Sequence, residues 1–324
     1  MPFIDVFNGD ADGICALHQI RLNEPRPDAR LVTGIKRDIN LLAGLIDTRD
    51  SNITVLDISL DRNRDALEQL LDSGNTIFYA DHHYSGLIPD SENLEAHIDP
   101  SPQTCTSLIV DALLDGKFKP WAVVGAFGDN LDEAALQAAA TFDLAPSAID
   151  NLKETGILLN YNGYGASLDD LFFTPDELYR QVHKYQDPLA FHAESSALKT
   201  LRDGYGHDMN LATGYLPAAE SPYGRIYELP SKSWARRVAG VYSNTLARER
   251  PEMAHGLIIA NSDSTYRISV RAPLNNRSGA DELCRQFPTG GGRAAAAGIN
   301  NLPADQLDRF QQSFMKQFDR HSSY

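Results

Sequence analysis

The sequence predicts an α/β protein whose first part is a parallel β-sheet with helices on both faces. Two observations support this prediction. Short apolar segments alternate with amphipathic helical segments over residues 2–116, and several of the apolar segments end in an aspartate. Alternating strands and helices are typical of parallel sheets, and ligands of such sheets bind beyond the carboxyl ends of the strands. The aspartates fall at those ends.

The predicted strands are short, β-rich runs bounded by Gly, Asn or Asp, and they cover residues 2–8, 29–35, 52–59 and 75–83. The predicted helices have apolar residues at helical spacing or end at Gly, and they cover residues 12–23, 61–74 and 104–116. The apolar segment 121–130 fits a strand or a buried helix equally well, because periodicity does not separate the two.

The length of 324 residues suggests two domains. We expect a first domain over 1–200 that includes a helical connector, a Gly-rich and polar linker over 201–224, and a smaller α/β domain over 225–324. The second domain is predicted to contain a helix over 233–249, two strands and a glycine run.

Charge differs between the two parts of the chain, whose net charge is −15. Residues 1–224 contain 20 more acidic than basic residues, and residues 225–324 contain five more basic than acidic ones. An acidic surface repels long polyanions, so duplex nucleic acid is not an expected partner. The basic part could hold a small anion, although solubility alone also explains the acidity.

The sequence predicts a cytoplasmic protein with no membrane partner. No apolar run approaches the roughly 18 residues that a membrane span needs, and the N-terminus lacks a signal-peptide pattern. The three cysteines are far apart and form neither a disulfide framework nor a CxxC metal motif. A homodimer is compatible with the sequence.

Aspartates recur where the predicted strands end. Asp10, Asp12, Asp57 and Asp81 occupy these positions. A single aspartate there often caps a helix, but several together suit a hard divalent cation, and imidazole adds affinity for manganese, iron or zinc. If the segment is extended, Asp10 and Asp12 point to the same face and reach two neighbouring ions. Asp57 could bridge the ions, and two ions would then activate a water for attack on phosphorus.

The segments GDADG (9–13), VLDIS (55–59), YADHH (79–83) and AFGDN (126–130) resemble, in this order, the motifs of the DHH phosphoesterase superfamily. That superfamily includes RecJ-type exonucleases, nano-RNases, cyclic-dinucleotide phosphodiesterases and some pyrophosphatases. ISVRAP (268–273) and TGGGRAAAAG (289–298) resemble the DHH-associated (DHHA-type) substrate-binding domain. The resemblance extends from residue 5 to residue 299.

The resemblance implies a role for each motif residue. The implied ligands of two divalent ions, manganese with magnesium or cobalt as alternatives, are Asp10, Asp12, Asp57, His82 and Asp129. Asp81 would be an outer ligand or would orient a histidine, and His83 would face the substrate as a general acid or a donor to the phosphate. A partly buried structural histidine is the alternative for His83.

Three positions depart from the family pattern. Val6 stands where nano-RNase-like members have a metal-binding His, and Asn8 stands where RecJ-type members have Asp. One metal site would therefore carry less negative charge. Arg293 stands where the glycine motif usually has His, and its permanently charged guanidinium suits a phosphate.

The glycine run is the predicted anion site of the second domain. Gly290, Gly291 and Gly292 allow backbone N–H groups to approach a ligand closely, and the alanine-rich 293–298 segment is expected to begin a helix behind them. Arg271 on the preceding strand would add a positive charge.

The sequence therefore predicts a divalent-metal-dependent phosphodiesterase. Its expected substrates are very short single-stranded oligonucleotides or linear dinucleotides such as pGpG, which it would hydrolyse to 5′-mononucleotides. A RecJ-like single-strand exonuclease and a nucleotide bisphosphate phosphatase are the enzymatic alternatives. A nucleotide-binding regulator with a decayed metal site is the alternative without catalysis, and Val6 and Asn8 would favour it.

Overall fold

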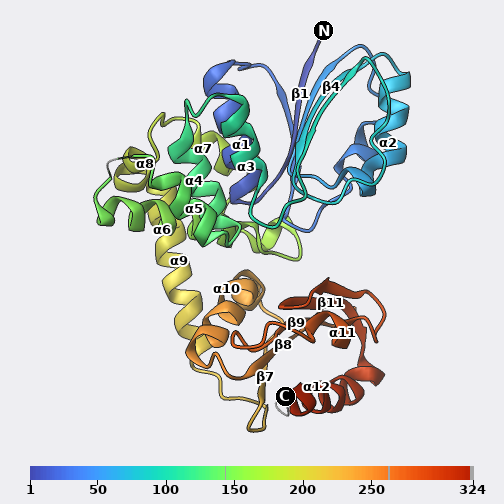
Figure 1. Ribbon diagram of the computed structural model, residues 1–324, viewed down its shortest axis with the longest axis vertical. Coiled ribbons are helices and arrows are strands. Elements are labelled where there is room, and N and C mark those ends of the chain that lie inside the picture. Colours follow the sequence, from blue (N-terminus) through green and yellow to red (C-terminus); the bar gives the residue numbers. More distant parts are fainter. Residues whose placement is uncertain (143, 262, 322–324) are drawn as a thin grey trace. The chain divides into compact units, whose positions relative to one another are not determined.

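The computed structural model describes residues 1–142, 144–261 and 263–321. They belong to two compact units, Met1–Asp203 and Gly204–Tyr324, which Figure 1 shows in one ribbon. The units divide within one helix, α9 (Ser196–Thr213). No helix of the described chain combines the length and the apolar character that crossing a membrane requires. We describe each unit by itself.

The first unit is built on a sheet of five parallel strands in the order β2-β1-β3-β4-β5. The strands are β1 (Phe3–Asn8), β2 (Arg30–Gly34), β3 (Asn52–Leu56), β4 (Thr76–Asp81) and β5 (Leu94–Ile98). The strand order changes direction between β1 and β3, and ligands of such sheets bind at the carboxyl ends on either side of this switch point. The predicted fold class is confirmed.

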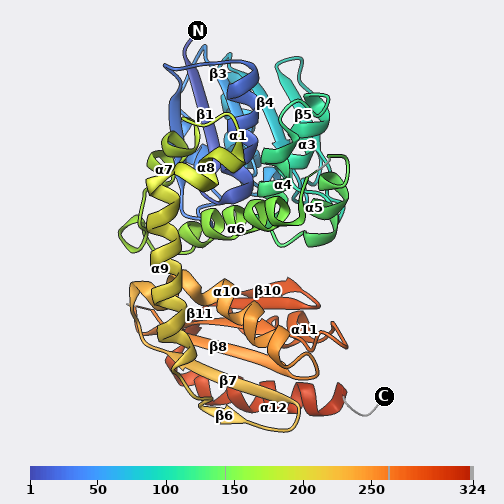
Figure 2. The same cartoon turned by 90° about the vertical axis from the view of Figure 1, so that its left-hand side faces the viewer.

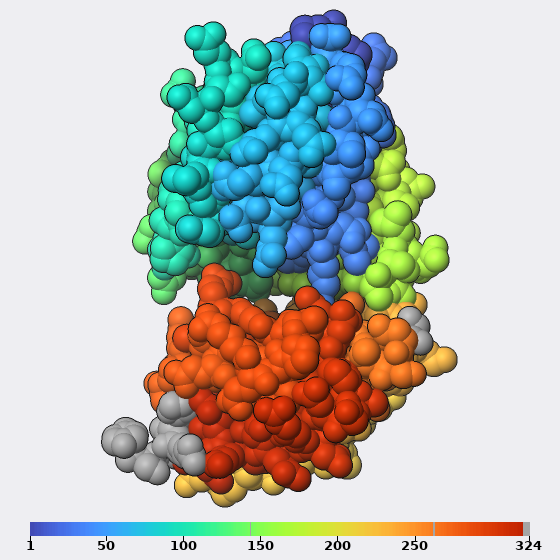
Figure 3. Space-filling model, turned by 90° about the vertical axis from the view of Figure 1, so that its right-hand side faces the viewer, coloured from blue at the N-terminus to red at the C-terminus, as the bar shows by residue number. Residues whose placement is uncertain are grey.

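Helices cover both faces of this sheet (Figure 1). α1 (Ala11–Asn23) and α3 (Thr106–Leu113) lie on one face, and α2 (Leu60–Asp72) and the short η1 (Leu41–Leu45) lie on the other. In Figure 3, the side chains of α2 and the segments beside it, in light blue, form the surface over that second face. Alternate apolar residues of β1, β3 and β4, among them Val6, pack under α2. Val6 is therefore a core residue without a polar role.

The remaining elements of the first unit are helical. They are α4 (Lys119–Gly128), α5 (Asp132–Ala139), α6 (Pro146–Gly163), η2 (Leu168–Asp170), α7 (Pro175–Val182), α8 (Pro188–Glu194) and the first part of α9. The apolar segment 121–130, which fits a strand or a buried helix in the sequence, forms most of α4 and is therefore a buried helix. It needs no polar face, because α1, α3 and α6 pack around it. α6 passes near the carboxyl ends of the strands (Figure 2).

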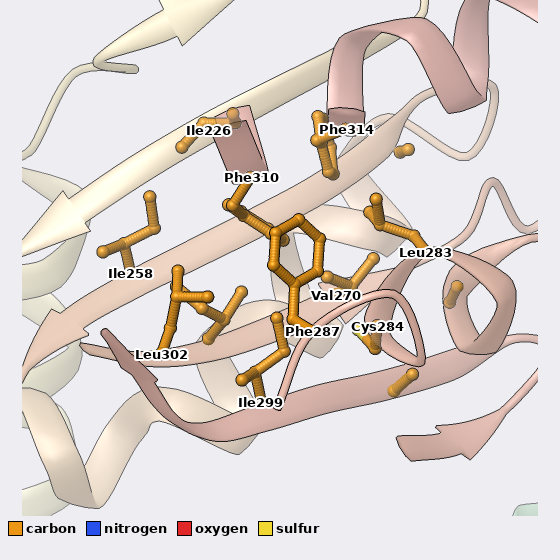
Figure 4. Packing of buried hydrophobic residues seen from close by; sticks show 14 of the residues in the cluster. Ile226, Ile258, Val270, Leu283, Cys284, Phe287, Ile299, Leu302, Phe310 and Phe314 are labelled. Carbon is orange, nitrogen blue, oxygen red and sulfur yellow. The ribbon is translucent and has the colours of Figure 1, made fainter. Parts of the chain in front are cut away.

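The second unit has a mixed six-stranded sheet in the order β10-β11-β9-β8-β7-β6. Its strands are β6 (Ala219–Glu220), β7 (Gly224–Leu229), β8 (Ala254–Ala260), β9 (Thr265–Arg271), β10 (Gly290–Arg293) and β11 (Ala296–Pro303). Its helices are α10 (Ser233–Glu249), α11 (Ala280–Cys284), η3 (Ala304–Gln306) and α12 (Leu307–His321). Figure 4 shows the core between sheet and helices, in which Phe287, Phe310 and Phe314 pack against the β-strand residues.

Two local predictions for the second half of the chain are wrong. Much of the predicted linker 201–224 is helical, because α9 continues to Thr213 despite its glycines and polar residues. The alanine-rich segment after the glycine run is not a helix. β10 and β11 form a hairpin, and Ala297 lies in the core opposite Val270 of β9. Sheet pairing and burial here outweigh the helix propensity of alanine.

A buried ion pair ties α1 to the sheet. On the face opposite α2, the guanidinium of Arg21 donates to both carboxylate oxygens of Asp5, at 2.9 and 2.5 Å, and to the hydroxyl of Thr54 at 2.9 Å. Both charged side chains are almost fully buried. Because Asp5 is the carboxylate that binds the Arg21 guanidinium with two hydrogen bonds, removal of either residue leaves the other charge poorly compensated in the core.

We predict that Asp5→Ala lowers the free energy of unfolding by about 3–5 kcal/mol, the cost of leaving a buried charge unpaired. Urea denaturation measures this loss. Glu95→Ala is the control, because Glu95 pairs with His97 at the surface, and its loss should change stability by less than about 0.5 kcal/mol. Equal effects of the two substitutions would contradict the assigned role of the Asp5–Arg21 pair.

Candidate metal centre and anion site

The first motif lies where β1 turns into α1. The carboxylate of Asp10 caps α1 by accepting hydrogen bonds from the backbone N–H groups of Asp12 and Gly13, at 3.0 and 3.1 Å. Gly13 is required here, because a Cβ at this position would overlap the backbone carbonyl oxygen of Asn8. The tight turn places the Asp10 carboxylate at the carboxyl end of β1, beside the switch point of the sheet.

Asp12 does not lie in an extended segment, so the prediction that Asp10 and Asp12 share one face of a strand is wrong. Asp12 belongs to the first turn of α1, and its buried carboxylate caps α3 instead. It accepts from Thr106 N at 2.7 Å, from Ser107 N at 2.8 Å and from Ser107 Oγ at 2.5 Å. These donors satisfy part of the helix N-terminus and stabilise the ionised carboxylate.

Asp57 follows β3 and has a strained backbone. Its φ of +57° lies in the left-handed region, which is uncommon for residues other than glycine and is found at functional sites. The side chain is buried, and Oδ1 accepts from the hydroxyl of Thr106 at 3.3 Å. Because Thr106 also donates to Asp12, α3 connects the two carboxylates.

His82 presents one ring nitrogen to two carboxylates. Its Nδ1 lies 3.1 Å from the carbonyl oxygen of Thr104, and a proton on Nδ1 can be donated to it. Nε2 then faces Asp57 Oδ1 at 3.5 Å and Asp129 Oδ2 at 3.9 Å. A hydrogen bond to a backbone carbonyl that fixes the ring with its other nitrogen turned to a cation is typical of metal-binding histidines.

His83 and Asp81 form a second pair beside this cluster. His83 Nδ1 lies 2.7 Å from Asp81 Oδ1, and Asp81 is fully buried. The imidazole is 44 % exposed, so its other nitrogen can reach a ligand. Asp81 Oδ2 has no hydrogen-bond partner among the described residues. The pair therefore resembles a buried carboxylate that orients an accessible histidine.

Lys36, which the sequence analysis missed, enters the centre from the segment after β2. Its ammonium forms an ion pair with the carboxylate of Asp10 and lies 3.3 Å from Asp129 Oδ1 and 3.1 Å from Asn160 Oδ1. The prediction considered only acidic and histidine residues at strand ends. Applied to every charged residue there, the same rule would have found Lys36 two residues beyond β2.

The pKa values in the centre are set by burial and by the neighbouring charges. Burial and the negative charges of Asp10 and Asp12 raise the pKa of Asp57 well above its usual range. Burial also raises the pKa of Asp10, but Lys36 outweighs this effect and leaves the pKa lowered. Burial lowers the pKa of His82, whereas its contact with Asp57 raises it to about 10. The carboxylates of the centre therefore need positive charge beside them.

The donor set fits a divalent cation. Asp57, His82 and His83 offer one ligand atom each within 4.8 Å of one another, and Asp129 Oδ2 lies 3.9 Å from His82 Nε2. Carboxylate oxygen with imidazole nitrogen suits manganese, iron or zinc. The Asn8 amide oxygen is a further buried acceptor that has no hydrogen-bond partner among the described residues. Asp12 contributes negative charge next to these atoms while it caps α3.

The predicted anion-site residues lie together in the second unit. Arg293 of β10 and Arg271 of β9 flank the same residue, Ala296 of β11, so both side chains leave the same face of the sheet. Arg271 is positioned by Asn244 of α10, whose Oδ1 accepts from Nε at 2.7 Å. Arg293 is exposed. Arg271 and Arg293 therefore lie on the same face of the sheet, at the position of Ala296 along the strands.

The three glycines have different roles. A Cβ at Gly290 would overlap the carbonyl oxygen of Cys284, and Gly292 has a φ of +137° that disfavours other residues. A Cβ at Gly291 would meet no atom within 4 Å. Gly290 and Gly292 are therefore explained by the hairpin itself, and Gly291 is the glycine that leaves open space beside the backbone.

Comparisons with solved structures show the fold. The chain is similar to RecJ from Thermus thermophilus in complex with Mn²⁺, with a TM-score of 0.63, 15% identity and coverage of 98% of this chain and 52% of that one. It is similar to an exonuclease RecJ bound to manganese, with a TM-score of 0.61, 14% identity and coverage of 100% of this chain and 90% of that one. It is also similar to the pGpG-specific phosphodiesterase PggH from Vibrio cholerae, with a TM-score of 0.55, 13% identity and coverage of 98% of this chain and 99% of that one.

The chain therefore has the fold of the DHH phosphoesterases, and the resemblance noted in the motifs is confirmed at the level of the fold. The chain spans about half the length of the Thermus RecJ structure and nearly all of PggH. No protein-family model and no curated protein matches the sequence.

We predict that Asp57→Asn stabilises the metal-free protein at pH 7, because a carboxyl whose pKa is raised by folding opposes folding at any pH at which the unfolded chain is ionised. Below the unfolded pKa of about 3.9, both states are protonated and the variant gains nothing. As the pH rises, the Asp57 carboxyl ionises less readily in the folded protein than in the unfolded chain, so the gain grows. Urea denaturation in the presence of a chelator, at pH 4 and at pH 7, measures the difference in free energy of unfolding between the variant and the wild type. An equal gain at both pH values would contradict the explanation.

Proposed function

We propose that this chain is a divalent-metal-dependent phosphodiesterase that hydrolyses very short single-stranded oligonucleotides or linear dinucleotides, such as pGpG, to 5′-mononucleotides. The observation that carries the proposal is the approach of Asp57 and Asp129 to the same nitrogen of His82, beside the switch point of the sheet. The arginines and the open glycine of the second unit support an anionic substrate. PggH, which shares the fold over nearly its whole length, is described as pGpG-specific.

The proposed metal is manganese, and the proposed ligands are those of the four motifs. A divalent ion at these ligands supplies Lewis-acid chemistry, which lowers the pKa of a water and neutralises charge on a phosphoryl oxygen. The chain's residues hold the ligand atoms in place: Thr104 fixes the ring of His82, and Thr106 fixes Asp57. Because these partners are backbone groups or short side chains, the ligand geometry needs little reorganisation when a cation binds.

His83 is the proposed proton donor. With Nδ1–H donated to buried Asp81, its Nε2 is directed away from the carboxylate and is accessible. In the imidazolium form, Nε2–H would donate to the substrate phosphate or give its proton to the leaving oxygen.

Arg271, Arg293 and the backbone at Gly291 are the proposed phosphate-binding groups of the second unit. A guanidinium can bind two phosphate oxygens at once, and the two arginines lie at one level of the sheet. The acidic balance of residues 1–224 disfavours long strands, which is why we propose short ones. A cytoplasmic location is proposed because all three cysteines are free and buried.

A RecJ-like exonuclease acting on single strands is the second candidate, because two RecJ structures share the fold with TM-scores of 0.63 and 0.61. The two activities differ in their dependence on substrate length. A panel of labelled oligonucleotides of two to about ten residues, cyclic dinucleotides and a nucleotide bisphosphate, each with Mn²⁺, distinguishes them.

We predict that dinucleotides disappear first in this panel and that 5′-mononucleotides accumulate. Asp57→Ala should lower kcat by more than about 100-fold, because even outer-shell partners of metal sites contribute about 10–100-fold. Processive shortening of the longer strands would favour the exonuclease. If the nucleotide bisphosphate were the one substrate of the panel to be hydrolysed, the result would favour a nucleotide bisphosphate phosphatase. Inertness with every metal, together with tight nucleotide binding, would overturn the enzyme assignment.

We predict that Gly291→Ala raises KM about tenfold with little change in stability, because the added methyl group meets no protein atom but fills the space in which a phosphate would approach the backbone. Arg293→Ala should raise KM by about 10–100-fold, the value of a charge-assisted hydrogen bond. Arg285→Ala is the control, since Arg285 pairs with Asp281 at the surface and should leave KM unchanged. Steady-state kinetics and thermal unfolding measure these effects. Unchanged KM in both test variants would remove the glycine hairpin from the substrate site.

A further inference from the structure

We infer that the ammonium group of Lys36 takes the place of one of the two divalent ions expected at this centre, so that the chain binds a single divalent ion on the Asp57–His82–Asp129 side. This inference rests on the proposed metal centre and specifies its composition. It concerns a residue that none of the four motifs contains.

The surroundings of Lys36 Nζ are those of a bound cation. Three side-chain oxygens from three different elements converge on it: the carboxylate of Asp10, which caps α1, Asp129 Oδ1 at 3.3 Å and Asn160 Oδ1 at 3.1 Å. The Tyr164 ring lies on a further side, with its centroid 5.7 Å from Nζ. An ammonium can donate three hydrogen bonds, and the three oxygens provide an acceptor for each.

The backbone holds Lys36 in this place. The Lys36 N–H donates to the carbonyl oxygen of Gly163 at the end of α6, at 3.0 Å. The Lys36 carbonyl oxygen accepts from the Asn8 amide at 3.3 Å, at the end of β1. The side chain is only 22 % exposed. Lys36 is therefore anchored between β1 and α6 and is not a solvent-exposed lysine that happens to reach the centre.

Asp129 shows that two cation positions lie side by side. Its Oδ1 faces Lys36 Nζ at 3.3 Å, and its Oδ2 faces His82 Nε2 at 3.9 Å. One carboxylate thus divides its two oxygens between the lysine and the Asp–His cluster. The position beside His82 offers imidazole nitrogen and carboxylate oxygen to an ion. The position beside Asp10 is filled by the ammonium of this chain.

The charges on the Asp10 side agree with this assignment. Asn8, whose amide donates to the Lys36 carbonyl oxygen, is neutral and adds no negative charge on this side of the centre. The single charge of Asp10 is matched by that of Lys36. A divalent ion entering this position would meet the positive charge of Lys36, which already pairs with the Asp10 carboxylate and with one oxygen of Asp129. The His82 side has no such lysine contact among the described residues and keeps its carboxylates for a metal ion.

A lysine in this position has a chemical consequence. An ammonium does not lower the pKa of a water as a divalent ion does, but it can donate a hydrogen bond to a phosphate oxygen. Lys36 would therefore contribute charge stabilisation to the bound phosphoryl group and would do so at any metal concentration. The centre would need one metal ion per chain to be complete.

Metal stoichiometry tests the inference without reference to activity. Mn²⁺ bound per chain is measured by equilibrium dialysis with elemental analysis, and electron paramagnetic resonance at low temperature distinguishes isolated Mn²⁺ from an exchange-coupled pair. The variants are Lys36→Arg, which keeps the charge, Lys36→Met, which keeps the aliphatic stem but removes the charge, and Lys36→Met combined with Asn8→Asp, which also restores a carboxylate.

We predict one isolated Mn²⁺ per chain in the wild type and in Lys36→Arg, and a coupled pair in the double variant. In Lys36→Met the uncompensated Asp10 should destabilise the metal-free protein, and added Mn²⁺ should raise its Tm by more than it raises that of the wild type. A coupled pair in the wild type would overturn the inference and leave the proposed metal centre intact. One ion in the double variant would overturn the inference as well. No bound Mn²⁺ in any variant would overturn both the inference and the proposed function.

Discussion

The mutual repulsion of carboxylates gathered beside the switch point of one sheet is the constraint on which the rest of the first unit depends. Four aspartates are involved: Asp10, Asp12, Asp57 and Asp129. They come together because β1 and β3 are neighbours and because α4 ends close to α1. Each has a compensating partner, namely Lys36 for Asp10 and Asp129, the N-terminus of α3 for Asp12, and His82 for Asp57 and Asp129. Without those partners, burial of so much like charge would oppose folding.

The four aspartates are not compensated to the same extent, and this difference is what makes the centre a candidate cation-binding site. Asp12 is satisfied by backbone N–H groups, and Asp10 has an ammonium of its own. Among the described residues, Asp57 has ion-pair contacts with His82 and His83 but with no lysine or arginine, and its backbone is strained. Strain and an elevated pKa at one buried carboxyl are features that folding stability alone does not favour, and they persist where a bound group compensates for them. The cation-binding capacity of the centre is therefore concentrated around Asp57 and His82.

Much of this arrangement follows from the sequence. Strand-end aspartates and the strand–helix alternation predict the parallel sheet, its helices on both faces and the edge at which the acidic motifs meet. Three features do not follow, for physical reasons. The partner of Asp12 is α3, a contact between residues far apart in the chain, which local spacing cannot reveal. The segment after the glycine run is alanine-rich, but pairing with β9 makes it a strand. Lys36 carries the wrong sign for a search restricted to metal ligands, so its position beyond β2 passed unnoticed.

We propose that oxygen and nitrogen donors from three separate segments, Asp57, His82 and Asp129, bind one divalent cation. Anomalous diffraction from crystals equilibrated with Mn²⁺ tests it most directly, because the signal locates the ion without reference to any assay. We predict a peak within about 2.0–2.4 Å of donor atoms of Asp57, His82 and Asp129, as expected for oxygen and nitrogen ligands. Density for these side chains with no peak between them, or a peak only elsewhere on the chain, would contradict it.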